Sequence, residues 1–357
     1  MRSTASTDQI CYSRSESIFL NCTPTVSHPT VNSHSSISDN IPFIPQQGDP
    51  LGPLLFCDTI QPLLTSLESE LTLGYLDDVT LGGPQDIVIS DIQRITTEGG
   101  NLGLHLNPSK CEVITNPGLT VSDPTLQSFK QVEVQDAALL GAPLFPGSVL
   151  DSTWDDRCAD LTRAADRLRS INAQDSLILL RLSFSAPRVQ HLLRCSPSVD
   201  HPALKTFDNI LRSAVSDITN ADISDVQWLQ ASLPIKQGGL GVREVHSLAR
   251  PAYLASAAST LDLQTSVLTA CPCATDSHFE SYLSSWQADG GILSTSDPLP
   301  PKQSFWDKPG IMSARDLVES SYSDPQHRAR FLAAASCNQC SNNRGRAPSF
   351  CNRPLSF

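Results

Sequence analysis

The chain has 357 residues, of which 25 are Lys or Arg and 37 are Asp or Glu, so its formal net charge is −12. This balance argues against a protein that wraps nucleic acid with a uniformly basic surface. No apolar run approaches the ~20 residues that cross a bilayer, and no charged-then-apolar leader stands at the start. We therefore expect an intracellular chain without a membrane span, in either the nucleus or the cytoplasm.

Composition changes along the chain predict its domain organisation. Residues 1–45 are rich in Ser, Thr, Pro and Asn, and we expect them to be disordered or to form a strand remnant without partners. Residues 46–147 alternate short apolar runs with turn residues, whereas residues 148–285 show helical periodicity. Periodicity fades from 286 to 357, which we expect to be an irregular tail. The predicted fold class is α+β, with a mixed first part followed by a helical bundle.

The first elements in chain order are a helix and an acidic hairpin. The helix is predicted from Pro53 to about Ser69, with a kink or an early end at Pro62. Residues 71–83 predict a β-hairpin with Asp77-Asp78 at its tip. Two adjacent carboxylates repel each other, and hard ions such as Mg²⁺ take carboxylate oxygens and share such sites with substrate phosphates. The tip indicates a metal site for phosphoryl or nucleotidyl transfer, with a solvated polar turn as the alternative.

Further elements follow from periodicity and from turn residues. A helix is expected to begin at Pro84 and to stop at Gly99-Gly100. Strands are predicted at 104–106 and 111–115, and a further strand pair within residues 132–145. Amphipathic helices are then predicted in four stretches: 161–171, 177–195 with an interruption at Pro187, 204–215, and 246–265.

Four segments occur in an order and spacing that closely resembles the palm of reverse transcriptases from non-LTR, LINE-type retrotransposons. They are Gln46-Gln47-Gly48-Asp49-Pro50, Tyr75-Leu76-Asp77-Asp78, Leu104 to Cys111, and Leu140-Gly141. The resemblance covers residues 46–147 closely and 150–255 loosely. It implies a partial palm followed by an α-helical thumb-like region. It also implies an RNA-directed DNA polymerase that uses Mg²⁺, an RNA template and a DNA primer.

The same resemblance implies a role for each matching residue. It makes Asp77 and Asp78 the catalytic metal ligands, with Asp77 the stronger of the two, and it places Lys110 near the pyrophosphate. An ordinary surface lysine is the alternative for Lys110.

The remaining matches concern nucleotide, template and primer. Gln47 and Gly48 match residues that contact the nucleotide and the template. Tyr75 matches a position at the primer end, with an ordinary half-buried strand tyrosine as its alternative. Leu140 and Gly141 match the primer grip, where the glycine allows a tight turn.

One component of the family's metal site has no match. The family supplies a further essential Asp from an upstream strand, but neither Asp8 nor Asp39 lies in an alternating apolar run. Residues 48–147 also carry 13 acidic and only 3 basic residues, without basic fingers to offset them. We therefore expect an N-terminally truncated, catalytically incomplete polymerase. Two alternatives stay open: an active polymerase completed by Asp8, Asp39 or a second chain, and a non-enzymatic RNA- or protein-binding module kept from the thumb region.

Two smaller patterns complete the sequence-based expectations. The segment Leu233 to Gly241 also resembles a family signature, in which glycines form a tight turn and Lys236 either touches phosphate or is simply solvated. The 11 cysteines are expected to stay reduced, with Cys57 and Cys111 as small core residues.

Overall fold

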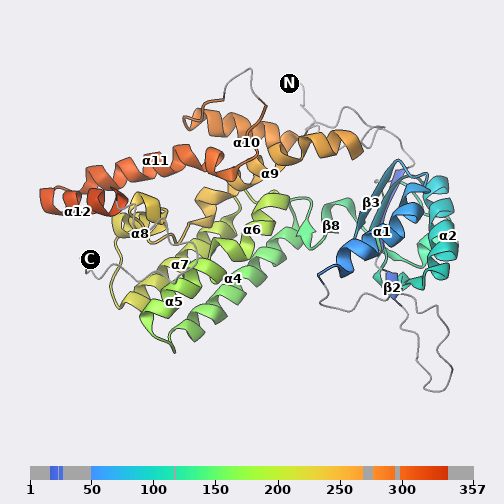
Figure 1. Cartoon of the computed structure of the whole chain (residues 1–357), viewed down its shortest axis with the longest axis horizontal. Coiled ribbons are helices and arrows are strands. Elements are labelled where there is room, and N and C mark those ends of the chain that lie inside the picture. The colour runs from blue at the N-terminus through green and yellow to red at the C-terminus, as the bar shows by residue number, and fades with distance from the viewer. Residues whose placement is uncertain are drawn as a thin grey trace. The chain divides into compact units, whose positions relative to one another are not determined.

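The computed structural model describes residues 17–22, 24–26, 50–115, 118–267, 276–293 and 298–336. The chain divides into two compact units: residues 1–137 with 262–275, and residues 138–261 with 276–357. The first unit contains the main sheet and the second is mostly helical, so the predicted α+β class is confirmed (Figure 1). The division after Ala137 lies about ten residues before the boundary expected from the sequence. Gln47 and Gly48 lie outside the described residues.

The first unit is built on a five-stranded sheet with the order β3-β4-β1-β6-β7. Its strands are β1 (Ser17–Cys22), β3 (Leu71–Tyr75), β4 (Asp78–Pro84), β6 (Glu112–Thr115) and β7 (Lys130–Val132). Strand β1 is antiparallel to both β4 and β6, whereas β7 is parallel to β6. The helices are α1 (Gly52–Thr65), α2 (Gln85–Asn101) and the short α3 (Pro124–Gln127). The order β1-α1-β3-β4-α2-β6 is the β-α-β-β-α-β arrangement of split βαβ folds.

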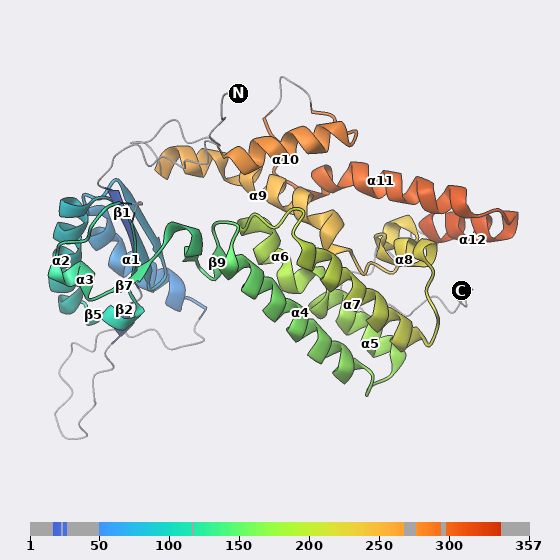
Figure 2. The same ribbon diagram turned by 180° about the vertical axis from the view of Figure 1, so that it is seen from behind.

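One face of this sheet forms the core of the first unit. Alternate residues of β1, β4 and β6 are buried on that face: Leu20, Cys22, Val79, Leu81 and Val113. Val88 and Ile92 of α2 pack against them, and Figures 1 and 2 show α1 and α2 lying along the sheet. A second, two-stranded sheet pairs β2 (Pro24–Val26) with β5 (Leu104–Leu106), and 3₁₀ turns occupy η1 (Pro108–Lys110) and η2 (Val134–Asp136).

Three expectations for this unit need correction. Ser17–Cys22 is not disordered or unpartnered, because β1 hydrogen-bonds to a strand on each side. Helix α2 does not stop at Gly99-Gly100 but continues to Asn101, and Gly103 then takes a positive φ of 77°. Strand β7 pairs with β6 instead of with the segment that follows it.

The second unit starts with a small hairpin and continues as a bundle of helices. The hairpin consists of β8 (Ala138–Leu139) and β9 (Ala142–Pro143). The helices are α4 (Ser148–Leu168), α5 (Ala173–Leu179), the π-helical turn η3 (Leu180–Phe184), α6 (Ala186–Cys195), α7 (Pro202–Thr219), α8 (Asp225–Ser232), the 3₁₀ turn η4 (Ile235–Gln237), α9 (Val245–Val267), α10 (Ser277–Ala288), α11 (Gln303–Ser321) and α12 (Pro325–Ser336). The last residues of α9, from Asp262, belong to the first unit. Helices α4 and α7 lie side by side in both views (Figures 1 and 2). Their shared core includes Trp154, Leu161, Phe207 and Leu211.

The expected irregular tail from residue 286 is wrong for the described part, since α11 and α12 are regular helices. These two helices have few apolar residues, but the largest of them are buried in clusters with residues of other segments. Trp306 of α11 is buried against Trp286, while Val318 and Phe331 share a cluster with Leu233. Among the described helices, none combines the length and the apolar character that a membrane crossing requires.

Candidate functional site

The acidic pair lies at the tip of a tight hairpin, as the sequence predicts. Tyr75 at the end of β3 pairs with Asp78 at the start of β4, so only Leu76 and Asp77 connect the strands. Two-residue hairpin connections require positive φ at one or both central residues, and Leu76 has a φ of 55°. Asp77 is exposed and Asp78 is half-buried at the strand start. The strained turn therefore presents two adjacent carboxylates at one end of the sheet.

Close packing of α1 on β3 fixes the direction of this hairpin. Gly74 lies directly against Leu64 of α1, and a Cβ built there would stand 2.5 Å from the leucine Cδ1. Val79 and Leu81 of β4 are buried on the core face of the sheet. Because side chains alternate along a strand, Asp78 and Thr80 face the opposite side.

A buried carboxylate that the sequence interpretation missed holds the loop leading into β3. Asp91 of α2 is 1% exposed. It accepts hydrogen bonds from the backbone amides of Glu68 (3.0 Å to each carboxylate oxygen) and Ser69 (2.7 Å), and from the Ser69 hydroxyl (2.5 Å). Arg94, one turn further along α2, donates to the Ser66 carbonyl and pairs with Glu68. The signal was available, because Asp91 stands within the apolar stripe of α2 three residues after Val88.

The strand next to the hairpin places an amide, and not a carboxylate, beside the acidic pair. Asn21 of β1 pairs in register with Thr80, and the threonine hydroxyl donates to its Oδ1 at 3.4 Å. On the other side of β1, Glu112 pairs with Asn21 and forms an ion pair with Lys130 at 2.7 Å. Within the described residues, no three His, Cys, Asp or Glu side chains converge as a metal-binding group.

These donors fit part of a magnesium site. Carboxylate oxygens of Asp77 and Asp78 are the hard ligands that Mg²⁺ takes, and Mg²⁺ completes its shell with water and substrate phosphates. A two-metal centre, with ions about 3.5–4 Å apart, needs further carboxylates from a neighbouring segment. Asn21 offers one neutral oxygen, so the described residues of β1 and the hairpin do not supply the further carboxylate that a metal pair needs.

The sheet register brings two further expected residues to the same end of the first unit. Cys22 follows Asn21 and lies level with Val79, and β6 begins at the same end. Lys110, exposed in the turn η1 just before β6, is therefore about two strand spacings, or roughly 10 Å, from the start of β4. Tyr75 is 61% exposed beside the tip, so it is not the half-buried strand residue of the alternative interpretation.

The expected primer-grip residues form a turn in the second unit. Leu140 and Gly141 connect β8 to β9 and have φ values of 50° and 77°, as a type I′ turn requires. The Leu140 carbonyl lies 3.2 Å from Nε2 of His191 on α6. The tight turn expected at Gly141 is confirmed.

The glycine-rich segment 233–241 also forms the expected tight turn. Gly238 and Gly241 have positive φ, and a Cβ on Gly239 would lie 2.1 Å from the Leu233 carbonyl oxygen. Lys236 is exposed in the turn η4, where both of its interpretations stay possible.

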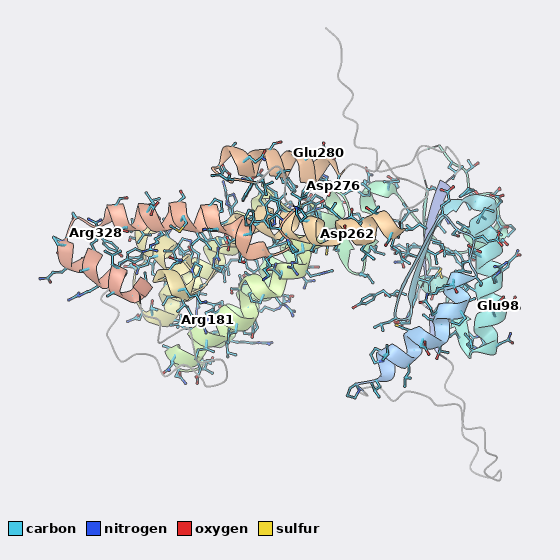
Figure 3. The ribbon with its side chains drawn as sticks, turned by 45° about the horizontal axis from the view of Figure 1, so that its top comes forward. Glu98, Arg181, Asp262, Asp276, Glu280 and Arg328 are labelled. Atoms are coloured by element: carbon cyan, nitrogen blue, oxygen red, sulfur yellow. The ribbon has the colours of Figure 1, made fainter. Side chains whose placement is uncertain are left out.

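The second unit contains an open cleft that two arginines line, Arg181 and Arg243. The cleft has a volume of about 310 Å³ and is lined by residues of η3, α6 and α11 together with Arg243. Arg243 forms a two-pronged ion pair with Asp307 at 2.8 and 2.9 Å, so its charge is matched. Arg181, a residue of η3 that is labelled in Figure 3, makes no ion pair with any residue that the structure describes.

Comparison with known proteins adds no further assignment, because no family model and no curated protein matches the sequence.

Proposed function

We propose that the chain is a reverse-transcriptase-type polymerase of the non-LTR retrotransposon kind, whose first unit acts as a palm and whose second unit acts as a helical thumb. The observation that carries this proposal is the two-residue hairpin that presents Asp77 and Asp78 at the end of a β-α-β-β-α-β sheet. In this proposal the activity is RNA-directed nucleotidyl transfer, with an RNA template and a DNA primer as partners.

The hairpin suits this chemistry for electrostatic reasons. Nucleotidyl transfer depends on positioning and on neutralising charge that develops on phosphate oxygens. An exposed carboxylate pair can share a divalent ion with an incoming triphosphate, and Lys110 at the same sheet end supplies a cation for pyrophosphate. Tyr75 is exposed beside the pair, where a primer end could lie against its ring.

We also propose that catalysis is incomplete in this form of the chain. The neighbouring strand offers Asn21 where a further carboxylate is needed, and the amide cannot balance a second divalent ion. Two-metal catalysis loses most of its transition-state stabilisation when one ion is missing, so binding of one ion without efficient extension is the expected behaviour.

A primer-extension assay with a paired binding assay tests both proposals. The full chain is supplied with an RNA template, a DNA primer and Mg²⁺ or Mn²⁺, and Mn²⁺ binding is measured separately by electron paramagnetic resonance. We expect the native chain to extend the primer no more than the D77N/D78N variant does. We expect the native chain to bind Mn²⁺ and the D77N/D78N variant to lose this binding. The control variant D86N, which replaces an exposed carboxylate on α2, should retain it. Primer extension by the native chain that D77N abolishes would overturn the proposal that catalysis is incomplete. Mn²⁺ binding that stays unchanged in D77N/D78N would remove the basis of the metal site.

A second candidate function, a non-enzymatic RNA-binding module, is favoured by the arginines of the second unit. Asp160 of α4 lies among Arg157 (3.5 Å), Arg188 (3.7 Å) and Arg163, so one carboxylate is shared by three guanidinium groups. Arg181 adds a further positive charge in the cleft, without an ion-pair partner among the residues that the structure describes. Arginine forks match phosphate geometry and retain their charge at every physiological pH.

RNA binding by the full chain tests the arginine surface on which this second candidate rests. Fluorescence anisotropy with single-stranded RNA is measured across salt concentration for the native chain, for R181Q/R188Q, and for R328Q, whose arginine pairs with Glu319 at 2.7 Å on other helices. Each lost phosphate contact should lower the slope of log K against log salt by about 0.7. We expect a decrease of about 1.4 for the double variant and none for R328Q; equal slopes in all three would exclude the arginine surface.

A further inference from the structure

Two cysteines face each other across the seam between β1 and β6. Asn21 pairs with Glu112 in this antiparallel pair, so the next position sets Cys22 opposite Cys111. The two side chains are 3% and 0% exposed and belong to the same buried cluster on the core face. Opposed residues in antiparallel strands have Cα atoms about 4.5–5.5 Å apart, within the 4.4–6.8 Å range of disulfides.

The sulfur atoms already interact in the reduced state. The Cys22 thiol donates a hydrogen bond to the Cys111 sulfur, and the Cys111 thiol in turn donates to the Asn107 carbonyl oxygen at 3.3 Å. The first of these hydrogen bonds lowers the pKa of Cys111 below its usual value and raises the pKa of Cys22. The geometry therefore places two thiols side by side, so that when one is oxidised the other can resolve the oxidised intermediate.

The other described cysteines have no such arrangement. Cys158 is buried in the second unit, where its thiol donates to the Ala203 carbonyl at 3.7 Å and burial raises its pKa to about 11. Cys57 is half-buried on α1, so the expectation that it is a core residue is wrong, and Cys195 contacts His191. These residues serve as matched controls.

We propose that Cys22 and Cys111 form a peroxide-oxidisable dithiol that closes to a disulfide across the β1–β6 seam. The Cys111 thiolate attacks one oxygen of hydrogen peroxide, the O–O bond breaks, and the products are a sulfenic acid and, after protonation, water. The Cys22 sulfur then attacks the sulfenic sulfur, the S–OH bond breaks, and a second water leaves with the Cys22 proton. Two thiols lose two electrons in total and one peroxide gains them.

The consequence is a covalent link between the strand next to the acidic hairpin and β6. In the reduced chain, β1 is held only by hydrogen bonds and core packing, and residues 23 to 110 form the loop that the link would close. Because the link constrains the unfolded chain, the oxidised first unit should melt at a temperature higher by on the order of 5–10 °C, and dithiothreitol should reverse this shift.

The experiment is peroxide titration of the fully reduced, full-length chain, followed by alkylation and digestion with trypsin. Cleavage after Arg14, Arg94, Lys110 and Lys130 puts the two cysteines on separate peptides, 15–94 and 111–130. We expect a dithiothreitol-sensitive product that joins these peptides and lacks two hydrogen atoms, formed equally in C57S and C158S and absent from C22S and C111S. C57S also shows that the link uses Cys22, because Cys57 shares its peptide.

Two results would overturn the proposal. One is a native, folded C57S chain in which peroxide leaves both thiols free for alkylation after unfolding. The other is a linked product that forms only in urea, which would show that the folded sheet keeps the sulfur atoms apart. Circular dichroism of C22S and C111S checks that loss of the link in these variants does not come from loss of the fold.

Discussion

Replacing Asp91 should loosen the approach to the acidic hairpin while leaving the second unit intact. The buried carboxylate of Asp91 is the common acceptor for the amides of Glu68 and Ser69 and for the Ser69 hydroxyl. Those residues stand directly before β3, so the carboxylate fixes where the strand begins. In D91A three donors lose their acceptor at once, whereas D91N keeps the side-chain shape and one acceptor oxygen.

The size of the effect follows from these contacts. A hydrogen bond to a charged acceptor contributes about 1.5–3 kcal/mol to stability. Glu68 is exposed, so water replaces part of what its amide loses, and we expect D91A to destabilise the first unit by about 3–5 kcal/mol. For D91N we expect about 1–3 kcal/mol.

Hydrogen exchange followed by mass spectrometry gives the required local measurement. Protection of residues 66–75 should fall in D91A, less in D91N, and not at all in D86N, whose exposed carboxylate is on the same helix. All four tryptophans lie in the second unit, so tryptophan fluorescence reports whether that unit still unfolds at the native midpoint. Unchanged protection of residues 66–75 in D91A would refute the role of Asp91 in fixing the start of β3. Equal losses of protection in D91A and D91N would mean that the negative charge matters more than the number of acceptor oxygens.

Two further predictions concern the second unit. G239A should destabilise it by roughly 2–4 kcal/mol in urea unfolding, because the new Cβ would lie 2.1 Å from the Leu233 carbonyl oxygen; G310A, in open space within α11, should stabilise it by about 0.5–1 kcal/mol. Burial raises the pKa of Asp208 to about 7, although it accepts hydrogen bonds from the amides of Val245 and His246. Between pH 4 and 7 the folded state therefore keeps a proton that the unfolded state has released. As the pH rises through this window, the stability of the native chain relative to D208N should fall by up to about 1.4 kcal/mol per pH unit in thermal melts. A stability difference that does not change with pH would contradict the raised pKa.

Local rules predicted the features that depend on neighbours in sequence. The acidic hairpin, the Leu140-Gly141 turn and the break before Pro187 all follow from residues within a few positions of each other. Strand β1 was missed because it is only six residues long and lies in a polar segment. Its strand character depends on pairing with β4 and β6, which are about 60 and 90 residues away, and no local pattern records such pairing.

Helices α11 and α12 were missed for a related reason. Their surfaces are mostly polar, and neither helix has a continuous apolar stripe. Each packs against the rest of the unit through one or two large buried side chains. Trp306 donates from its indole to the Pro300 carbonyl at 2.8 Å, and Trp286 donates to the Trp306 carbonyl at 2.7 Å. Isolated aromatic anchors stabilise a helix through tertiary contacts, which periodicity does not measure.

The identity of residue 21 offers the sharpest test of the site's geometry. Asn21 and Thr80 are directly opposed, so residue 21 is a diagonal neighbour of Asp78 on the same face of the sheet, about 7–8 Å away. Carboxylates at that separation can both reach one ion, since each oxygen–metal bond spans about 2 Å. N21D should therefore tighten Mn²⁺ binding by about tenfold, equivalent to about 1.4 kcal/mol, and D78N should abolish the gain. N220D, which adds the same charge in the second unit, should change nothing; an equal gain in N220D would show that net charge, and not the shared face of β1 and β4, controls the affinity.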